Sequence, residues 1–138
     1  MPVKAVSPYG SWASPITADI IVAGGLSFSE IRVDGDDVYW LEGRSAEAGR
    51  SVVVRRSIDG EEWDQIPAGF NARTGVHEYG GGVYAVRSGT IYFANWEDQR
   101  IYRVAENASP QALTGLPEVA RGDRYADLTI NGNSQWLC

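Results

Sequence analysis

The middle of the chain reads Val83-Tyr-Ala-Val-Arg-Ser-Gly-Thr-Ile-Tyr-Phe-Ala94, in which two short apolar and aromatic runs flank the turn signal Ser88-Gly89. Runs of this kind on either side of a glycine turn predict a β-hairpin. The pattern occurs earlier in Ser29-Glu-Ile-Arg-Val-Asp-Gly-Asp-Asp-Val-Tyr-Trp-Leu41, where Asp34-Gly35 supplies the turn. A strand-turn-strand unit therefore recurs along the chain, and the recurrence predicts an all-β fold.

Further alternating runs follow each hairpin and predict two more strands in each unit. They lie at residues 51–56 and 62–66 in the first unit, and at residues 100–104 and 111–113 in the second. A third unit begins with a predicted strand at 125–130, turns at Asn131-Gly132 and ends in a run at 135–138 that carries Trp136. Corresponding strand cores begin at residues 38, 91 and 135, so they are 53 and 44 residues apart.

These spacings fit the roughly 40 to 50 residues of a four-stranded β-propeller blade. An immunoglobulin-like sandwich, the second interpretation, also has short strands but does not require one unit to recur. We therefore predict an incomplete β-propeller of about two full blades plus the opening hairpin of a third. The predicted parts are an N-terminal extension (1–25), a first blade (26–70), a second blade (71–117) and the start of a third (118–138).

Because complete propellers have about four to eight blades, this chain is not expected to close a ring by itself. Its unpaired sheet edges then predict self-association or pairing with another chain. With 43% hydrophobic residues and 22% charged residues, the sequence is typical of a soluble folded domain. The net charge of −6 argues against nucleic-acid or anionic-membrane binding.

The localisation prediction is cytoplasmic. Residues 20–23 form the longest apolar run near the N-terminus, so neither a signal peptide nor a membrane span is predicted. The single cysteine, Cys138, excludes an intrachain disulfide and is compatible with a reducing compartment.

Six segments carry a resemblance to a known family. They are Tyr9-Gly-Ser-Trp-Ala-Ser-Pro-Ile-Thr-Ala-Asp19, Val38-Tyr-Trp-Leu-Glu-Gly-Arg44, Phe70-Asn-Ala-Arg-Thr74, Val76-His-Glu-Tyr-Gly-Gly-Gly82, Ile91-Tyr-Phe-Ala-Asn95 and Arg124-Tyr-Ala-Asp127. In this order they resemble the beginning of a prolyl-oligopeptidase-family (S9) serine peptidase, of the acylaminoacyl-peptidase and dipeptidyl-aminopeptidase-like branch. The resemblance covers almost the whole chain.

The resemblance implies an N-terminal propeller that gates access to a C-terminal α/β-hydrolase domain, where short or acyl-blocked peptides are hydrolysed. This chain matches the propeller part alone. It contains no Gly-x-Ser-x-Gly, the nucleophile motif of that domain, so we predict no catalytic residue and no peptidase activity for this chain by itself. The alternative function is a non-enzymatic interaction or self-assembly module that closes its ring between chains.

The candidate site lies in Arg73-Thr-Gly-Val-His-Glu-Tyr-Gly-Gly-Gly82, which holds the only histidine. The period of a strand predicts His77 and Tyr79 on one face and Glu78 on the other, with a bend at Gly80, Gly81 and Gly82. In one interpretation Arg73, His77, Glu78 and Tyr79 line the channel and contact a peptide or the hydrolase domain. In the other, His77 bonds a neighbouring blade and the glycines only bend the strand. Gly75 departs from the family, where a bulkier, often basic residue is expected.

We predict no cofactor and no metal. Asp34-Gly-Asp-Asp37 lacks the later glycine and glutamate of an EF-hand loop, since Tyr39 and Ser45 stand there. A weaker alternative is a metal-dependent hydrolase that uses Glu78, Asn95 and Asp127 at strand ends. Arg44, Arg73 and Arg124 each follow a loop or a glycine, and they either bridge blades through carboxylates or are solvated.

Overall fold

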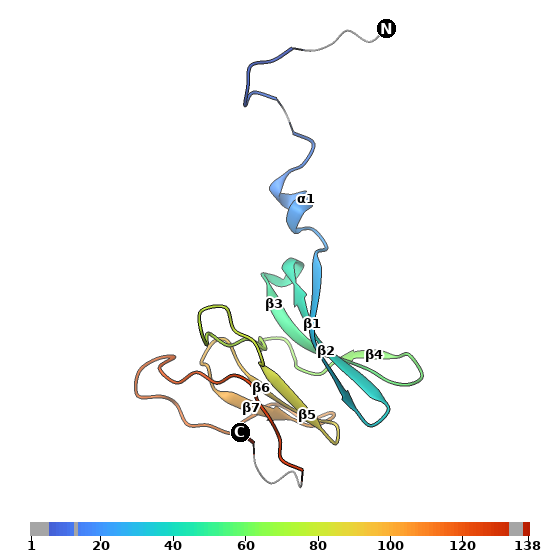
Figure 1. Cartoon of the computed structure of the whole chain (residues 1–138), viewed down its shortest axis with the longest axis vertical. Coiled ribbons are helices and arrows are strands. Elements are labelled where there is room, and N and C mark those ends of the chain that lie inside the picture. The colour runs from blue at the N-terminus through green and yellow to red at the C-terminus, as the bar shows by residue number, and fades with distance from the viewer. Residues whose placement is uncertain (1–5, 13, 133–136) are drawn as a thin grey trace.

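The computed structural model describes residues 6–12, 14–132 and 137–138, which form two four-stranded antiparallel sheets in chain order (Figure 1). The first sheet consists of β1 (Leu26–Asp34), β2 (Asp37–Arg44), β3 (Arg50–Arg56) and β4 (Glu62–Asp64). The second consists of β5 (Tyr84–Arg87), β6 (Thr90–Ala94), β7 (Ile101–Val104) and β8 (Gln111–Ala112). The prediction of an all-β fold is confirmed, and the two sheets do not form a closed ring.

Both predicted hairpins are present. The β1–β2 hairpin pairs Asp34 with Asp37, and the β5–β6 hairpin pairs Arg87 with Thr90. Ser88 and Gly89 have φ angles of 49° and 70°, the two positive values that a tight hairpin turn between twisted strands requires. The turn residues in the sequence therefore fixed the strand register correctly.

Two short helical segments accompany the sheets: α1 (Ala18–Val22), which the sequence analysis did not predict, and a 3₁₀ helix (Ser45–Glu47). The side chain of Thr17 caps α1 by accepting a hydrogen bond from the Ile20 amide. Figure 1 shows the N-terminal segment running away from both sheets beyond the start of β1. Among the described residues, no helix is long and apolar enough to cross a membrane.

One hydrophobic cluster extends across both sheets. Its members include Tyr39 and Val53 from the first sheet and Tyr84, Ile91 and Phe93 from the second, each fully buried. β3 contributes three consecutive buried residues, Val52, Val53 and Val54, so both of its faces are covered. The shared cluster buries the facing sides of the two sheets against each other.

The innermost strands of the two sheets are joined at a β-bulge. The register of β1 against β2 shifts at Glu30, whose φ is 51°. There the Glu30 carboxylate accepts a hydrogen bond from the Val83 amide (3.0 Å), and the Tyr84 hydroxyl donates to the Glu30 carbonyl oxygen (2.6 Å). A bulge bends its strand, so this contact fixes the angle at which β1 meets β5.

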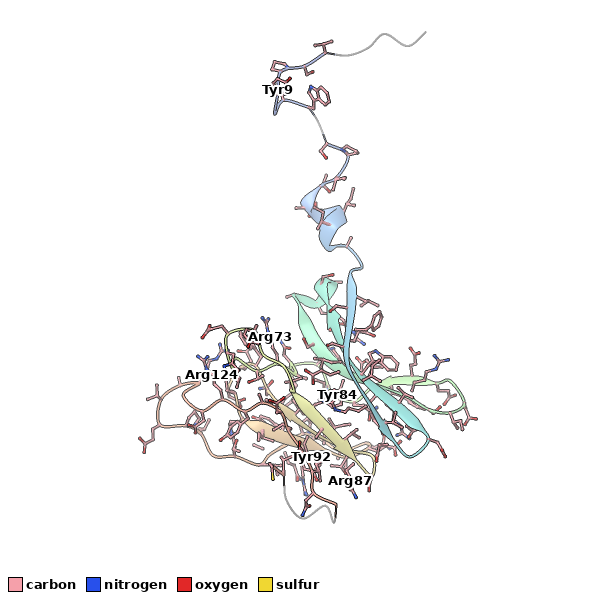
Figure 2. The ribbon with its side chains drawn as sticks, in the orientation of Figure 1. Tyr9, Arg73, Tyr84, Arg87, Tyr92 and Arg124 are labelled. Atoms are coloured by element: carbon pink, nitrogen blue, oxygen red, sulfur yellow. The ribbon has the colours of Figure 1, made fainter. Side chains whose placement is uncertain are left out.

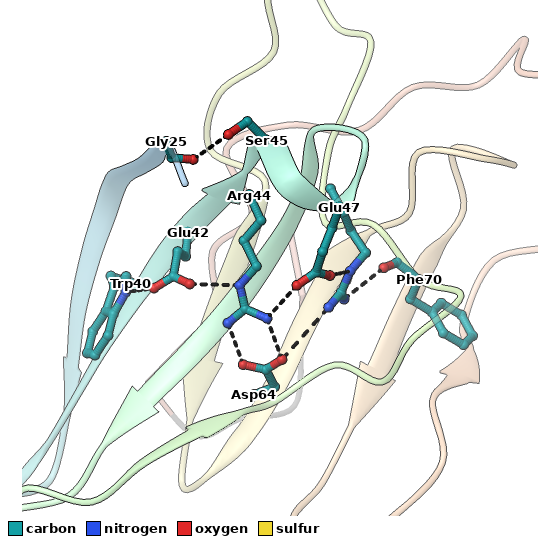
Figure 3. Close-up of polar contacts among 9 residues, drawn as sticks. Gly25, Trp40, Glu42, Arg44, Ser45, Glu47, Asp64 and Phe70 are labelled. Atoms are coloured by element: carbon teal, nitrogen blue, oxygen red, sulfur yellow. Dashed lines mark hydrogen bonds and ion pairs between the residues drawn. The ribbon is translucent and has the colours of Figure 1, made fainter. Parts of the chain in front are cut away.

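A network centred on Arg44 ties the outer strand of the first sheet to its interior (Figure 3). The Arg44 guanidinium donates two 2.7 Å hydrogen bonds to the Asp64 carboxylate and one of 2.7 Å to Glu42. Glu47 of the 3₁₀ helix accepts from both Arg44 and Arg50. Bidentate pairing of this kind is geometrically specific, so Arg44 acts within the first sheet and does not bridge to the second.

On the opposite side of the first sheet, the apolar side chains of β1 are uncovered. Leu26, Phe28, Ile31 and Val33 of β1 are all more than half exposed. Val33 is paired with Val38 across the hairpin, whereas the neighbouring pair of Arg32 and Tyr39 points to the buried side. The first sheet thus has one face packed on the second sheet, and we call the four exposed apolar side chains of β1 its free apolar face.

The predicted strand at 125–130 does not form over its whole length, although its end pairs with residues 137–138 as the predicted hairpin requires. This segment makes only an isolated bridge between Ile130 and Leu137, supported by hydrogen bonds between Thr129 and Cys138. Asp127 has a φ of 55°, which interrupts an extended backbone, and the Leu128 amide donates to the Gly82 carbonyl oxygen. Leu128 packs with Ala85 and Ile101 of the second sheet. The predicted strand position of Trp136 lies outside the described residues.

Candidate functional site

The candidate residues lie at one end of the two sheets, which we call the loop face (residues 71–82, 95–100 and 118–124). The Ala72 amide donates to the Ser51 carbonyl oxygen at the start of β3, and Ala72 bridges Asn95 just after β6. The N-terminal segment leaves from the same end, because Ser45 at the end of β2 bonds the Gly25 carbonyl oxygen. Figure 2 shows Arg73 and Arg124 at this end and Arg87 at the other.

The predicted strand geometry of His77, Glu78 and Tyr79 is wrong. His77 and Glu78 have φ angles of 54° and 68°, and the Gly80 amide donates to the Val76 carbonyl oxygen, so these residues form a turn. Two successive left-handed residues reverse the chain and abolish the two-residue alternation of a strand. The rings of His77 and Tyr79 nevertheless stack, with centroids 5.9 Å apart, and Tyr79 is 84% exposed.

The three glycines allow a crowded backbone crossing. Gly80, Gly81 and Gly82 have φ angles of 75°, 120° and 57°, a region that L side chains rarely adopt. A Cβ atom at Gly80 would lie 2.9 Å from the Thr74 carbonyl oxygen, and one at Gly82 would lie 2.5 Å from the Asp127 amide nitrogen. The glycines are thus required by the conformation and by the close approach of the segment around Asp127.

A buried amide side chain holds the candidate loop. Gln99 is 1% exposed, and its Oε1 accepts a 2.7 Å hydrogen bond from the Gly75 amide while its Nε2 donates to the Trp96 carbonyl oxygen. Asn95 acts in the same way one turn earlier, since its Oδ1 accepts from the Asn71 amide. These two residues supply hydrogen-bond partners to a segment that belongs to no strand.

The sequence analysis missed Gln99 and Asp98. Asp98 accepts hydrogen bonds from the Tyr102 hydroxyl (2.6 Å), the Asn95 side chain and the Arg100 amide. Burial alone raises the pKa of the Asp98 carboxyl, but these hydrogen bonds outweigh it and hold the pKa below its usual value. The sequence feature that could have indicated Asp98 and Gln99 is the polar turn at residues 95–100, which stands directly between two predicted strands.

The arginines of the loop face behave differently from one another. Arg124 donates from Nη1 to the Gly75 carbonyl oxygen (2.7 Å) and to the Glu78 carboxylate (3.2 Å). Arg73 and Arg121 instead stack on the indole of Trp96, with Cζ atoms 4.4 and 4.1 Å from the ring centroid. The sequence placed Arg73 in the site but gave no indication of Arg121.

Three open hollows surround the loop. One, of about 330 Å³, lies beside β1 and is lined by Glu30, Arg73 and Tyr79 among others. A second, of about 350 Å³, is lined by Gly75, Glu78, Trp96, Ala120, Arg121 and Arg124. A third, of about 330 Å³, contains Arg73, Trp96 and Glu97. Arg73, Glu78 and Tyr79 therefore border concave surface, whereas His77 lines none of these hollows.

A larger hollow of about 630 Å³ lies away from this face, between the outer strands of the two sheets. Its main cation, Arg55, is already paired with Asp37 and Glu106. This hollow therefore has fewer unpaired charged side chains than the loop face. For that reason we place the candidate site at the loop face.

The metal-binding alternative is not supported. No group of three His, Cys, Asp or Glu residues gathers as a metal site in the part of the chain that the structure describes. Glu78 pairs with Arg124, and the Asn95 amide is engaged with Asn71 and Asp98.

Successive four-stranded antiparallel sheets joined at their inner strands define the chain as part of a β-propeller. Comparison with solved structures then gives its family. The chain is 42% identical to a puromycin-hydrolysing peptidase of Mycobacterium tuberculosis, with a TM-score of 0.76, over 92% of this chain and 20% of that one. It belongs to the prolyl-oligopeptidase (S9) family.

Two further solved structures agree. A puromycin hydrolase is 35% identical over 94% of this chain, with a TM-score of 0.77, and a puromycin hydrolase mutant in complex with PGG is 36% identical over 92%, also with a TM-score of 0.77. The chain spans about a fifth of each protein, 21% in both cases. No protein-family model and no curated protein matches the chain.

Replacing Gln99 tests how the candidate loop is held. Gln99→Ala leaves the buried Gly75 amide without its partner, so we expect a loss of about 1–3 kcal/mol in the free energy of unfolding, measured with urea. Gln111→Ala is the matched control, because Gln111 is exposed on β8 and we expect a change within about 0.5 kcal/mol. Equal losses in the two variants would contradict the role assigned to Gln99.

Proposed function

We propose that this chain is the propeller part of a longer peptide-hydrolysing enzyme, with catalysis in an α/β-hydrolase domain outside these 138 residues. The observation that carries the proposal is an identity of 35–42% over more than nine-tenths of the chain to puromycin-hydrolysing peptidases about five times as long. The sequence contains no Gly-x-Ser-x-Gly, in agreement with a non-catalytic role for this part. The location we propose is the cytoplasm.

The loop face is the surface we assign to the catalytic domain and to the entry of substrate. The N-terminal segment leaves from this end with Tyr9, Trp12, Ile16 and Ile20 exposed, and apolar side chains of that size call for a partner surface. Arg73, Glu78 and Tyr79 border the hollows there, and His77 stacks beside Tyr79. In this role they contact short or acyl-blocked peptides on their way to the catalytic serine.

The first test is hydrolysis by the longer protein. We expect the coding sequence connected to residues 1–138 to specify a Gly-x-Ser-x-Gly motif, and the protein expressed with it to hydrolyse puromycin or short peptides. Serine-to-alanine substitution in that motif should abolish activity, and the 138-residue chain alone should have none. Absence of the motif, or turnover that survives loss of the serine, would refute the proposal.

A second test concerns Tyr79. In the longer protein, Tyr79→Ala removes an aromatic contact worth roughly 1 kcal/mol, so we expect KM to rise about fivefold while kcat changes less. Ile58→Ala is the control, because Ile58 is comparably exposed at 76% in the β3–β4 turn at the other end of the sheet. An unchanged KM for Tyr79→Ala would remove Tyr79 from the substrate path.

The free apolar face of the first sheet has a separate consequence. In the longer protein we assign it to a neighbouring blade, because Leu26, Phe28, Ile31 and Val33 lie on the innermost strand and its hairpin. In the 138-residue chain alone the same face is available to a second copy. Self-association of the isolated chain is therefore expected as a result of the uncovered face.

Light scattering tests this expectation. The 138-residue chain should have an apparent mass above that of a monomer at tens of micromolar concentration, a range typical of weak contacts. Phe28→Lys should shift the mass toward the monomer, because it places a charge on the apolar face, whereas Ile58→Lys adds the same charge elsewhere and should not. A wild-type chain that stays monomeric would contradict self-association through the free apolar face.

A further inference from the structure

We propose that the hollow lined by Gly75, Trp96, Arg121 and Arg124 binds a carboxylate group, carried by a peptide as its C-terminus or as an acidic side chain. The inference rests on the proposed function in one respect, that the ligand is a peptide. Recognition of a carboxylate group goes beyond that function. The hollow lies on the loop face and has a volume of about 350 Å³, enough for a single amino-acid residue.

The Arg121 guanidinium has the geometry of an anion receptor. Its Cζ lies 4.1 Å from the centroid of the Trp96 ring. A guanidinium stacked on an aromatic ring keeps its N–H donors in its own plane, where they remain free to bind a carboxylate in a bidentate manner. Within residues 6–12, 14–132 and 137–138, no carboxylate forms an ion pair with Arg121 or with Arg73.

Trp96 separates two cationic compartments. It lines the hollow that contains Arg121 and also the neighbouring hollow that contains Arg73. The Arg73 guanidinium lines one of these two hollows and the Arg121 guanidinium lines the other, and the Trp96 indole forms a wall of both. The proposal concerns the Arg121 side, because a second arginine, Arg124, lines that hollow.

Arg124 packs directly against Gly75. Gly75 is buried, and an added Cβ would lie 3.4 Å from Gln99 Oε1 and 3.6 Å from the Cδ and Cζ atoms of Arg124, which is ordinary van der Waals contact. Arg124 uses Nη1 for the Gly75 carbonyl oxygen and for Glu78. Its remaining guanidinium N–H groups have no hydrogen-bond partner among the described residues, and they provide the second donor set for an incoming carboxylate.

Arg121 occupies a left-handed backbone position. Arg121 has a φ of 59°, and the Gly122 amide closes a tight turn onto the Val119 carbonyl oxygen (2.8 Å). A left-handed position is occupied more easily by glycine or asparagine than by arginine, so holding an arginine there costs stability. Glu78, which also lines the hollow, has a φ of 68°.

Among the residues that line the hollow, the cationic groups outnumber the acidic ones. Glu78 is the only acidic residue among those that line it, and it is already paired with Arg124. The Asp98 carboxylate is turned to Tyr102 and Asn95, and Glu97 borders the neighbouring hollow. Two guanidinium groups against one carboxylate leave a local positive charge in a chain whose net charge is −6.

The test is a titration of the 138-residue chain, carrying Phe28→Lys to keep it monomeric, followed by NMR at the Trp96 indole N–H, which a Trp96→Phe variant assigns. The probes are N-acetyl-alanine and its uncharged analogue N-acetyl-alaninamide. We expect a saturable shift with the carboxylate and binding of the amide that is at least about tenfold weaker, because one charge-assisted pair accounts for that ratio. Inorganic phosphate is the third probe, since it shares the charge but not the shape.

Variants localise the effect. Arg121→Gln should weaken N-acetyl-alanine binding about tenfold, and Arg121→Lys, which keeps the charge but loses the planar fork, should weaken it less. Arg56→Gln is the matched control, because it removes the same charge from an exposed arginine on β3. Circular dichroism confirms that each variant is folded, and Arg124→Gln serves as a second variant if Arg121→Gln is not.

Equal affinity for acid and amide overturns the proposal, as does an Arg121→Gln variant that binds like the control. Phosphate binding more than about tenfold tighter than the carboxylate also overturns it, in favour of a phosphorylated ligand. The titration requires no catalysis, so a longer protein without hydrolytic activity defeats the proposed function and leaves this result unaffected. Conversely, a carboxylate-independent titration defeats only the inference.

Discussion

The loop face depends on one constraint: its buried backbone amides must find hydrogen-bond partners although the segment at 71–76 belongs to no strand. Asn95 and Gln99 meet this requirement by accepting from the Asn71 and Gly75 amides. Both are nearly fully buried, so water cannot replace them at low cost. Asp98 orders the turn that carries them, and its hydrogen bonds hold the pKa of its carboxyl below the usual value. The segment that connects the two sheets is therefore held by hydrogen bonds to a short polar turn that follows β6.

That support allows the loop to display side chains with little apolar burial of its own. Tyr79 and Arg73 are exposed, yet the backbone beneath them is anchored to both sheets. Arg121 and Arg124 reach the same place from a segment almost fifty residues away. The glycines at 80–82 permit that segment to approach closely. Rigid backbone and exposed cationic groups together are the usual basis of recognition on loops.

The membership of the S9 family gives meaning to the uneven burial of the sheets. The facing sides of the two sheets share one core, while β1 presents apolar residues to solvent. In a propeller each blade is covered on both faces by neighbours, so an uncovered first blade is expected wherever adjoining blades are not included. The Arg44 network attaches β4, the outer strand, to the rest of the first sheet by contacts within that sheet alone.

The sequence by itself determined the all-β class and both hairpin turns, because turn residues and two-residue alternation are local properties. It misjudged residues 76–79, where left-handed backbone at His77 and Glu78 is held by contacts it could not specify. It also predicted a strand at 125–130, which forms only an isolated bridge at Ile130, while Leu128 packs on the second sheet. Only the tertiary structure brought Arg121 and Arg124 to Trp96 and Gly75, since contacts between distant segments depend on how the sheets and loops pack.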